Sequence, residues 1–203
     1  MTRDDVEIFE TKTLWKGFFR VDRLRLRHRL FSGGWGHEIT REVFERGHAA
    51  ALLPYDPVRD EVVLIEQFRA GALTAGAEPW LVEIVAGIIE EGETAEEVVR
   101  RETVEEAGCE VTDVVPVMDV FTTPGGSSER IAIFVGRVDA QGVGGIHGLA
   151  DEGEDIRVFT ESLDAALRRM ADGGITNIIA VAALQWLALN RGNLRRDWLG
   201  GGA

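Results

Sequence analysis

The chain has 203 residues, a formal net charge of -13 at pH 7 and 45% hydrophobic residues. Such a chain can bury one substantial core. Its acidic balance argues against a nucleic acid partner, because binding to phosphate backbones depends on clustered Lys and Arg. A small phosphorylated substrate stays open, because a few arginines and metal ions can create a local positive site. The single cysteine, Cys109, forbids an intramolecular disulfide, and no basic and apolar signal opens the chain, so we expect a cytoplasmic protein.

The N-terminal segment carries strand signals. Residues 18–27 and 38–45 place aromatic and β-branched residues between charged ones at near-alternate positions, which predicts two half-exposed strands with a turn near Gly33. This strand-rich segment has too much exposed apolar surface to stand alone. We therefore expect a homodimer.

The middle of the chain predicts buried strands followed by a helix. Apolar runs at 49–54 and 61–67 flank a turn and form a hairpin, and residues 79–89 continue as strand and loop. Thr94 with Glu97 three residues later predicts a capped helix start, and a glycine at position 108 predicts its end.

The remaining chain predicts more strands, a glycine-rich loop and two helices. The strands are expected at 111–120, 131–138 and 156–160, the loop at 142–153 and the helices at 162–171 and 175–190. The charge-free run 173–190 is interrupted by polar residues and too short for a membrane span of ~20 residues, so a buried helix is expected and no membrane partner. This order predicts an α+β fold, with a mixed sheet flanked by helices.

Residues 87–109 form the most informative stretch. On a helix, Glu102 and Glu106 lie one turn apart with Glu105 beside them, so their carboxylates project toward a shared point. Carboxylates held together repel one another and need a partner, a raised pKa or a cation, and Mg²⁺ prefers such oxygen ligands. Taken alone, the spacing fits a solvated, charge-rich helix face better.

The complete pattern changes that balance. Seven fixed positions fit one signature: Gly87, Glu93, Arg101, Glu102, Glu105, Glu106 and Gly108. This pattern resembles the box motif of the Nudix hydrolases. Thr103 stands where that family usually has an aliphatic residue, and Cys109 fills the last apolar position; both concern packing.

The resemblance extends over residues 17–198, which look like the bacterial ADP-ribose pyrophosphatase branch of the family. It includes the motifs at 46–50, 66–69, 124–126 and 148–152. It implies an α/β/α sandwich, with residues 1–46 as an N-terminal β-strand dimerisation region and 47–203 as the Nudix hydrolase domain. It also implies hydrolysis of the ADP-ribose diphosphate to AMP and ribose 5-phosphate, with two or three Mg²⁺ ions, or Mn²⁺ in their place.

The same resemblance implies roles for individual residues. The metal ligands are the carbonyl of Ala86 and the carboxylates of Glu102, Glu106 and Glu154. Glu152, on the glycine-rich loop, is the general base, Glu105 supports the metal shell or replaces Glu152 as the base, and Arg101 braces the site together with Glu93. The substrate contacts are Phe18, Phe19, Arg41, Glu42, Arg46, Arg69, Ile88, Thr123, Pro124, Gly125 and Glu129.

Two alternatives stay open. The same chemistry could act on another nucleoside diphosphate sugar, such as a GDP-sugar, because the metal site contacts only the diphosphate. A ligand-sensing protein with this fold and no catalysis is the other, which the intact carboxylate set argues against.

Overall fold

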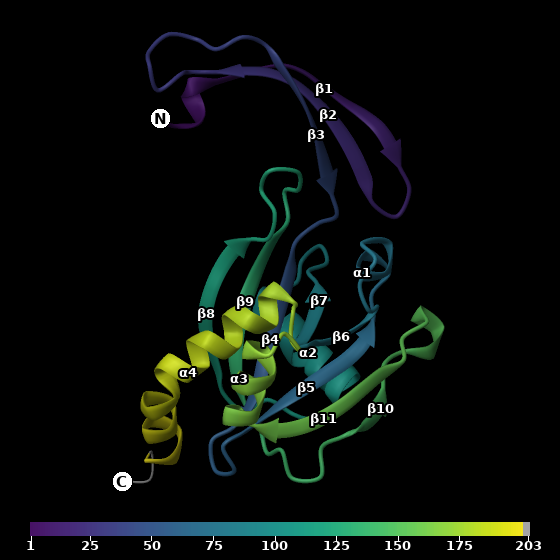
Figure 1. Ribbon diagram of the computed structural model, residues 1–203, viewed down its shortest axis with the longest axis vertical. Coiled ribbons are helices and arrows are strands. Elements are labelled where there is room, and N and C mark those ends of the chain that lie inside the picture. Colours follow the sequence, from purple (N-terminus) through teal and green to yellow (C-terminus); the bar gives the residue numbers. More distant parts are fainter. Residues whose placement is uncertain (201–203) are drawn as a thin grey trace. The chain divides into compact units, whose positions relative to one another are not determined.

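The computed structural model describes residues 1–200, apart from the side chain of Glu152. The chain divides into two compact units (Figure 1). The first comprises Met1–His48 and Phe121–Arg130, and the second comprises Ala49–Val120 and the residues from Ile131 onward.

The first unit is built on a three-stranded antiparallel sheet. Its strands are β1 (Val6–Lys16), β2 (Arg20–His28) and β3 (Ile39–Glu45), in the order β1-β2-β3. The sequence pattern predicted β2 and β3, which the structure confirms, but not β1. The pairing of β1 with β2 shifts register between Ile8 and Glu10 and again between Thr13 and Trp15. Each shift breaks the alternation by which a strand is recognised in a sequence.

The second unit contains a mixed eight-stranded sheet. Its path runs β10-β11-β5-β4-β9-β8, while β6 pairs with β5 and β7 pairs with β4. The central strand β4 lies parallel to β9 and antiparallel to β5 and β7. The strands are β4 (Ala49–Asp56), β5 (Glu61–Phe68), β6 (Trp80–Glu83), β7 (Val85–Ile88), β8 (Val114–Phe121), β9 (Arg130–Arg137), β10 (Gly145–His147) and β11 (Ile156–Ser162).

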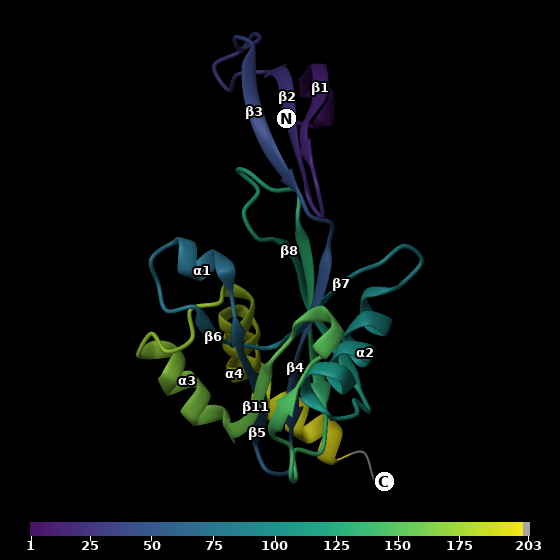
Figure 2. The ribbon, with the colours of Figure 1, turned by 90° about the vertical axis from the view of Figure 1, so that its right-hand side faces the viewer.

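Helices cover both faces of this sheet, which confirms the predicted α+β sandwich. They are α1 (Ala70–Thr74), α2 (Ala95–Ala107), α3 (Leu163–Ala171) and α4 (Ile178–Leu199), with short 3-10 turns at Arg3–Asp5 and Ala150–Glu152. Alternate residues of β4 point to opposite faces. Ala51 and Leu53 pack with α3 and α4, whereas Ala50 and Leu52 pack with α2. Figure 2 shows α2 and α3 on opposite sides of the strands.

The charge-free run near the C-terminus forms the first half of α4. Its residues Ala180, Leu184 and Leu187 are fully buried in the core, as expected of a buried helix. The helix continues nine residues beyond the predicted end at residue 190, to Leu199. Over residues 1–200, none of the helices combines the length and hydropathy that a membrane span requires.

Asp60 joins the β4–β5 turn to α4. It is the non-glycine residue with a positive φ, 60°, in the described chain. Its carboxylate accepts a hydrogen bond from the buried hydroxyl of Tyr55 at 2.6 Å and pairs with Arg191 and Arg195.

We expect Asp60→Ala to lower the free energy of unfolding by about 3 kcal/mol, because it leaves the Tyr55 hydroxyl unsatisfied and places a Cβ residue without polar compensation at positive φ. Urea unfolding measures this. Asp60→Asn, which tolerates the conformation and can accept the hydroxyl hydrogen bond, serves as the control, with an expected loss of about 1 kcal/mol. Equal losses for both variants would contradict this account.

Candidate active site

The helix α2 begins and ends as its sequence predicts. The Thr94 hydroxyl accepts from the Glu97 backbone N–H, the Glu97 carboxylate accepts from the Thr94 backbone N–H, and Gly108 adopts a left-handed conformation with φ 64°. Val98 and Val99 are fully buried against β4. This packing fixes which way the following turn of the helix, with its glutamates, faces.

The two box residues that depart from the usual pattern are packing residues, as predicted. The buried Thr103 hydroxyl donates to the Val99 carbonyl at 2.6 Å, one turn back, so its polar group is satisfied inside the core. Cys109 is 7% exposed, and burial raises the pKa of its thiol to about 11. At neutral pH this cysteine is a protonated core side chain.

Glu106 is a buried carboxylate, 3% exposed. One of its oxygens accepts a hydrogen bond from the Ala86 backbone N–H of β7 at 3.1 Å. Burial raises the pKa of Glu106 to about 8; the hydrogen bond from Ala86 opposes this rise, and the nearby charges of Glu102 and Glu154 add to it. A positive charge beside this carboxyl group would favour its ionised form and lower its pKa.

Glu102 lies against the backbone of β7 at Gly87. A Cβ atom built on Gly87 would overlap the Glu102 carboxylate. The pKa of Glu102 is raised, chiefly by burial, although the charge of Arg101 opposes the shift. The glycine that opens the box motif therefore makes room for the carboxylate that follows fifteen residues later.

Arg101 forms ion pairs with three glutamates of the box motif. Its guanidinium lies 3.3 Å from Glu93, 2.8 Å from Glu102 and 3.1 Å from Glu105. Glu93 in turn accepts from the Glu90 backbone N–H at 3.2 Å, which closes the loop between β7 and α2. Arg101 therefore connects the loop before α2 to two carboxylates of the helix.

The glycine-rich loop is fastened to α2 at its stem. Within it, β10 pairs with β11, and the Gly148 N–H donates to the Glu105 carbonyl at 3.4 Å. Glu154 accepts from the Leu149 N–H at 3.1 Å, and its charge acts on both Glu102 and Glu106. The side chain of Glu152, predicted as the general base, lies outside the described part of the chain.

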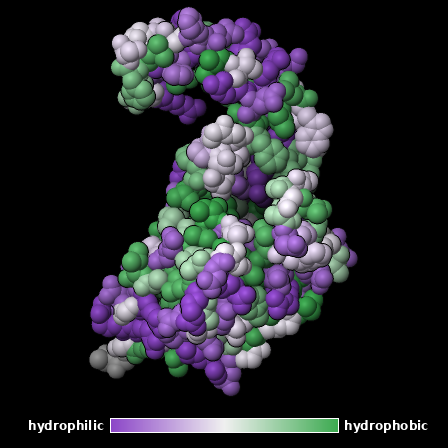
Figure 3. Space-filling view, in the orientation of Figure 1, coloured by the Kyte–Doolittle hydropathy of each residue, from purple (hydrophilic) through white to green (hydrophobic). Residues whose placement is uncertain are grey.

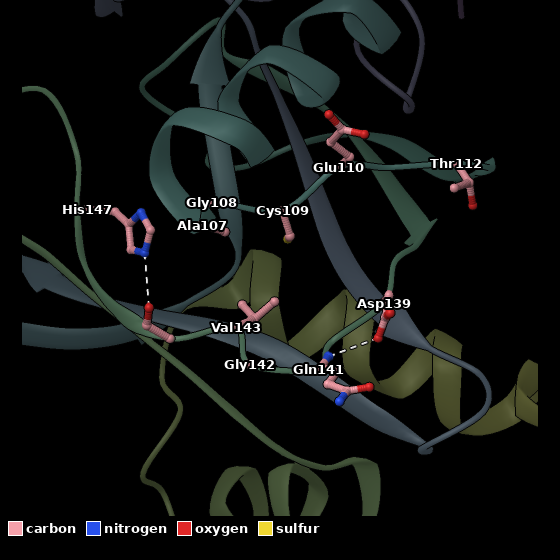
Figure 4. A pocket seen from close by; sticks show the side chains of 11 residues that line it. Ala107, Gly108, Cys109, Glu110, Thr112, Asp139, Gln141, Gly142, Val143 and His147 are labelled. Carbon is pink, nitrogen blue, oxygen red and sulfur yellow. Dashed lines mark hydrogen bonds between the residues drawn. The ribbon is translucent and has the colours of Figure 1, made fainter.

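A cavity of about 470 Å³ lies at the C-terminal end of α2 (Figure 4). It is lined by Gly108, Cys109 and the loop up to His147, whose ring nitrogen lies 3.1 Å from the Gly144 carbonyl oxygen. A Cβ on Gly108 would overlap the His147 ring. The box carboxylates are not among the residues that line it. The cavity therefore borders the stem of the loop, and the ring contact helps to hold that stem.

Most of the predicted substrate contacts lie in the first unit. There Arg46 forms an ion pair with the buried Glu129 at 3.0 Å and lies over the ring of Phe19, 5.6 Å from its centroid. Phe19 also contacts Phe18 edge-to-face at 4.8 Å between ring centroids. The first unit thus brings these four residues together from two distant segments of the chain.

The other predicted contacts are more dispersed. Thr123 accepts backbone hydrogen bonds from Gly126 and Ser127, so the stretch with Pro124 and Gly125 forms a turn in the first unit. Arg41 and Glu42 lie exposed on β3 of the same unit. Arg69 and Ile88 belong to the second unit, with the box carboxylates.

Glu83 was not singled out in the sequence. It is 3% exposed on β6, and its carboxylate accepts from the Arg69 guanidinium at 2.8 Å and from the Asn177 amide at 2.9 Å. The one available signal was a charged residue inside the apolar run 80–85, since a buried charge needs a partner.

Comparison with known proteins decides the family. A family model described as NUDIX domain matches residues 45–180. The chain belongs to the Nudix family. A relative, the ADP-ribose pyrophosphatase of Escherichia coli (strain K12), is 55% identical over 196 residues, which cover 97% of this chain and 94% of the relative. The resemblance drawn from the box motif is confirmed.

Two further proteins are similar to the chain over most of its length. The GDP-mannose pyrophosphatase of Cronobacter sakazakii (strain ATCC BAA-894) is 32% identical over 91% of this chain and 96% of its own length. A solved structure, described as the crystal structure of ADP compounds hydrolase, superposes with a TM-score of 0.74 at 21% identity, and covers 94% of this chain and 97% of its own. The latter likeness confirms the fold.

The donor set of this Nudix site fits a magnesium ion. Among the described side chains, no three His, Cys, Asp or Glu residues form a complete cage for a metal. Mg²⁺ does not need one, because it keeps several waters and binds through one or two carboxylates plus substrate phosphates. Glu106, which is buried, and Glu102, which is partly buried, would supply two such carboxylates.

The metal-free Nudix protein is expected to lose stability as the pH rises. Because the folded pKa of Glu106 is about 8, above its ordinary value of 4.5, the folded state binds more protons than the unfolded state between these values. Stability from this group is complete below pH 4.5 and declines up to pH 8, by a few kcal/mol. Melting temperatures measured in EDTA from pH 5 to 9 should show the decline.

The variant Glu106→Gln isolates this effect. Glutamine can still accept the Ala86 hydrogen bond and does not ionise, so the decline should become shallower and the metal-free protein more stable at pH 8. Glu96→Gln, which changes an exposed glutamate on the same helix, should keep the parent profile. Identical profiles for Glu106→Gln and the parent would refute the assignment.

Proposed function

We propose that this protein hydrolyses the diphosphate of ADP-ribose, yielding AMP and ribose 5-phosphate, with magnesium as its cofactor. The observation that carries the proposal is a pair of carboxylates one helical turn apart, the buried Glu106 and the partly buried Glu102, with Gly87 leaving room for Glu102. The two carboxylates would hold a divalent cation, and oxygens of the substrate diphosphate would be further ligands. The 55% identity to an ADP-ribose pyrophosphatase supports the choice of substrate.

The metal ligands in this proposal are the Ala86 carbonyl and the carboxylates of Glu102, Glu106 and Glu154. Two or three Mg²⁺ ions, or Mn²⁺ in their place, would neutralise the diphosphate and make a bound water more acidic. Glu106 keeps its carboxylate aligned through the hydrogen bond from Ala86. Arg101 orients Glu102 and prevents the acidic residues from separating.

Glu152 is the proposed general base, which takes the proton from the attacking water as its oxygen approaches phosphorus. The alternative base is Glu105. Its carboxylate already accepts a hydrogen bond from Arg101 at 3.1 Å, which holds it beside Glu102. That contact supports Glu152 for the base and Glu105 for a supporting role.

Recognition of the nucleoside is assigned to the first unit. Phe18, 85% exposed, offers a free aromatic face for adenine, and Phe19 beside it is held by Arg46. Arg41, Glu42 and Glu129 supply polar groups for the base and ribose. Thr123, Pro124, Gly125, Ile88 and Arg69 are proposed to contact the ribose and phosphates.

A homodimer is part of the proposal, with residues 1–46 as the dimerisation region and 47–203 as the hydrolase domain. Large apolar side chains of the N-terminal sheet are exposed, among them Ile8 at 57%, Trp15 at 55% and Phe31 at 98%. Figure 3 shows hydrophobic residues interspersed with hydrophilic ones over this sheet. Such a surface is typical of an interface. Light scattering that finds only monomers at micromolar concentration would reject it.

The proposed setting is the cytoplasm, with a small-molecule partner and neither nucleic acid nor membrane. The net charge of -13 argues against nucleic acid and membrane partners, because it repels polyphosphate chains and anionic surfaces. Within this acidic protein, attraction of a small diphosphate depends on the bound cations and a few arginines.

Product analysis with ADP-ribose and Mg²⁺ tests the function directly. AMP and ribose 5-phosphate should appear in equal amounts, and none should form in EDTA. GDP-mannose is the competing substrate, since a relative named for it is 32% identical. A higher kcat/KM for GDP-mannose than for ADP-ribose would favour that alternative, and no turnover of either would favour a non-catalytic protein.

A further inference from the structure

Glu83 occupies an unusual position for a charged side chain. It lies on β6, directly opposite the fully buried Ile65 of β5, and its side chain is 4% exposed. Burying a carboxylate is costly unless it is paired and hydrogen-bonded. The surrounding residues meet that requirement completely.

Each oxygen of this carboxylate has partners. One accepts from Arg69 Nε at 3.3 Å and from Asn177 Nδ2 at 2.9 Å, and the other accepts from Arg69 Nη2 at 2.8 Å and Arg69 Nε at 3.1 Å. Gln67 approaches at 3.5 Å. The side-on, two-point pairing of Glu83 with Arg69 fixes the plane of the guanidinium as well as its distance.

Arg69 also interacts electrostatically with carboxylates of the box and of the glycine-rich loop. The charges of Glu106 and Glu154 act on Arg69, and the charge of Arg69 acts in return on Glu106. Nη1 makes no hydrogen bond within the described residues, and the Arg69 side chain is 44% exposed. One edge of this guanidinium is therefore bound to Glu83, while the other is available to an anion.

We propose that Glu83 is a positioning residue, which holds Arg69 so that its Nη1 edge takes an oxygen of the substrate diphosphate. Asn177, whose side-chain oxygen also caps the start of α4, keeps Glu83 in place. This inference rests on the proposed function, because it assumes a diphosphate at the box carboxylates. It assigns to a core residue of β6 a role in the affinity for substrate.

Glu83→Gln tests the role. The glutamine amide can accept only at one atom, so one of the two bonds to Arg69 is lost and the guanidinium can rotate. We expect KM for ADP-ribose to rise about ten-fold and kcat to change less than three-fold, because charge-assisted hydrogen bonds of this kind contribute roughly one power of ten. The matched control is Glu161→Gln, which removes a similar two-point pair with Arg169 and should leave KM unchanged.

A double-mutant cycle separates positioning from a general structural role. In an Arg69→Ala background, Glu83→Gln should change kcat/KM less than two-fold, because the group it positions is gone. It should at the same time raise the melting temperature of that background, because it removes an unpaired buried charge. In this background Glu83→Gln would then change the melting temperature but not kcat/KM. If Glu83 had only a structural role, the two quantities would change together.

Two results would overturn the proposal: KM of Glu83→Gln within two-fold of the parent, or an undiminished effect in the Arg69→Ala background. Failure of the proposed function is a different result, a folded parent that cleaves no ADP-ribose. In that case calorimetry with inorganic pyrophosphate and Mg²⁺ is applied to the same variants. About ten-fold weaker binding by Glu83→Gln than by the parent and Glu161→Gln would support positioning, and equal affinities would reject it.

Discussion

Glu106→Gln is expected to lower kcat/KM for ADP-ribose by about three orders of magnitude at saturating Mg²⁺, which corresponds to about 4 kcal/mol of transition-state stabilisation. The variant keeps the shape of the side chain and its hydrogen bond from Ala86 but removes the buried negative charge. Stability should not fall, since the charge is costly to bury in the absence of metal. Steady-state assays over a range of Mg²⁺ concentrations measure the effect.

Matched variants on the same helix sharpen this expectation. Glu102→Gln should also lose activity, by about two to three orders of magnitude, because it removes the second proposed carboxylate ligand. Glu96→Gln changes an exposed glutamate paired with Arg100 and should stay within two-fold of the parent. Activity of Glu106→Gln and Glu102→Gln within a few-fold of the parent would remove the proposed metal site.

The helix of the box could be predicted because its signals are local. A capping box at Thr94 and a glycine at position 108 fix its ends within the sequence itself, and helical spacing places Glu102 and Glu106 on one side. The order of strands and helices gave the fold class for the same reason. Features of this kind depend on residues a few positions apart.

Other features depend on contacts between residues far apart in the sequence, which no local pattern predicts. Glu83 meets Asn177 across 94 residues, and Ser128 meets Glu45 across 83. The strand β1 went unpredicted because two register shifts interrupt its alternation. The strand β4 pairs with β5 only near their turn and then with β7 and β9, so the predicted hairpin is a small part of its partnership.

The structure gives a physical reason for one fixed position of the box motif, Gly87. The pattern identifies Gly87 as a fixed position without giving a reason. In the structure the reason is steric, because the Glu102 carboxylate fills the space that a Cβ on Gly87 would occupy. No conformational requirement is involved, since Gly87 is not among the residues with positive φ.

Gly87→Ala should therefore reduce activity without unfolding the protein. The added Cβ would overlap the far end of the flexible Glu102 side chain, which can turn away without any backbone movement. A ligand displaced by about 1 Å costs roughly two orders of magnitude in rate, so we expect kcat/KM to fall about one hundred-fold. The melting temperature should stay level or rise slightly, because alanine restricts the unfolded chain more than glycine does.

The control is Gly192→Ala, on α4, where an added Cβ meets no atom within 4 Å. It should show the same small gain in melting temperature with unchanged kinetics. A Gly87→Ala variant that keeps parental kcat/KM would mean that Glu102 acts equally well from another position. A variant that loses activity and also melts well below the parent would mean that Gly87 serves the fold of β7. Only loss of activity at parental stability fits a glycine retained to let a metal-binding carboxylate approach the strand.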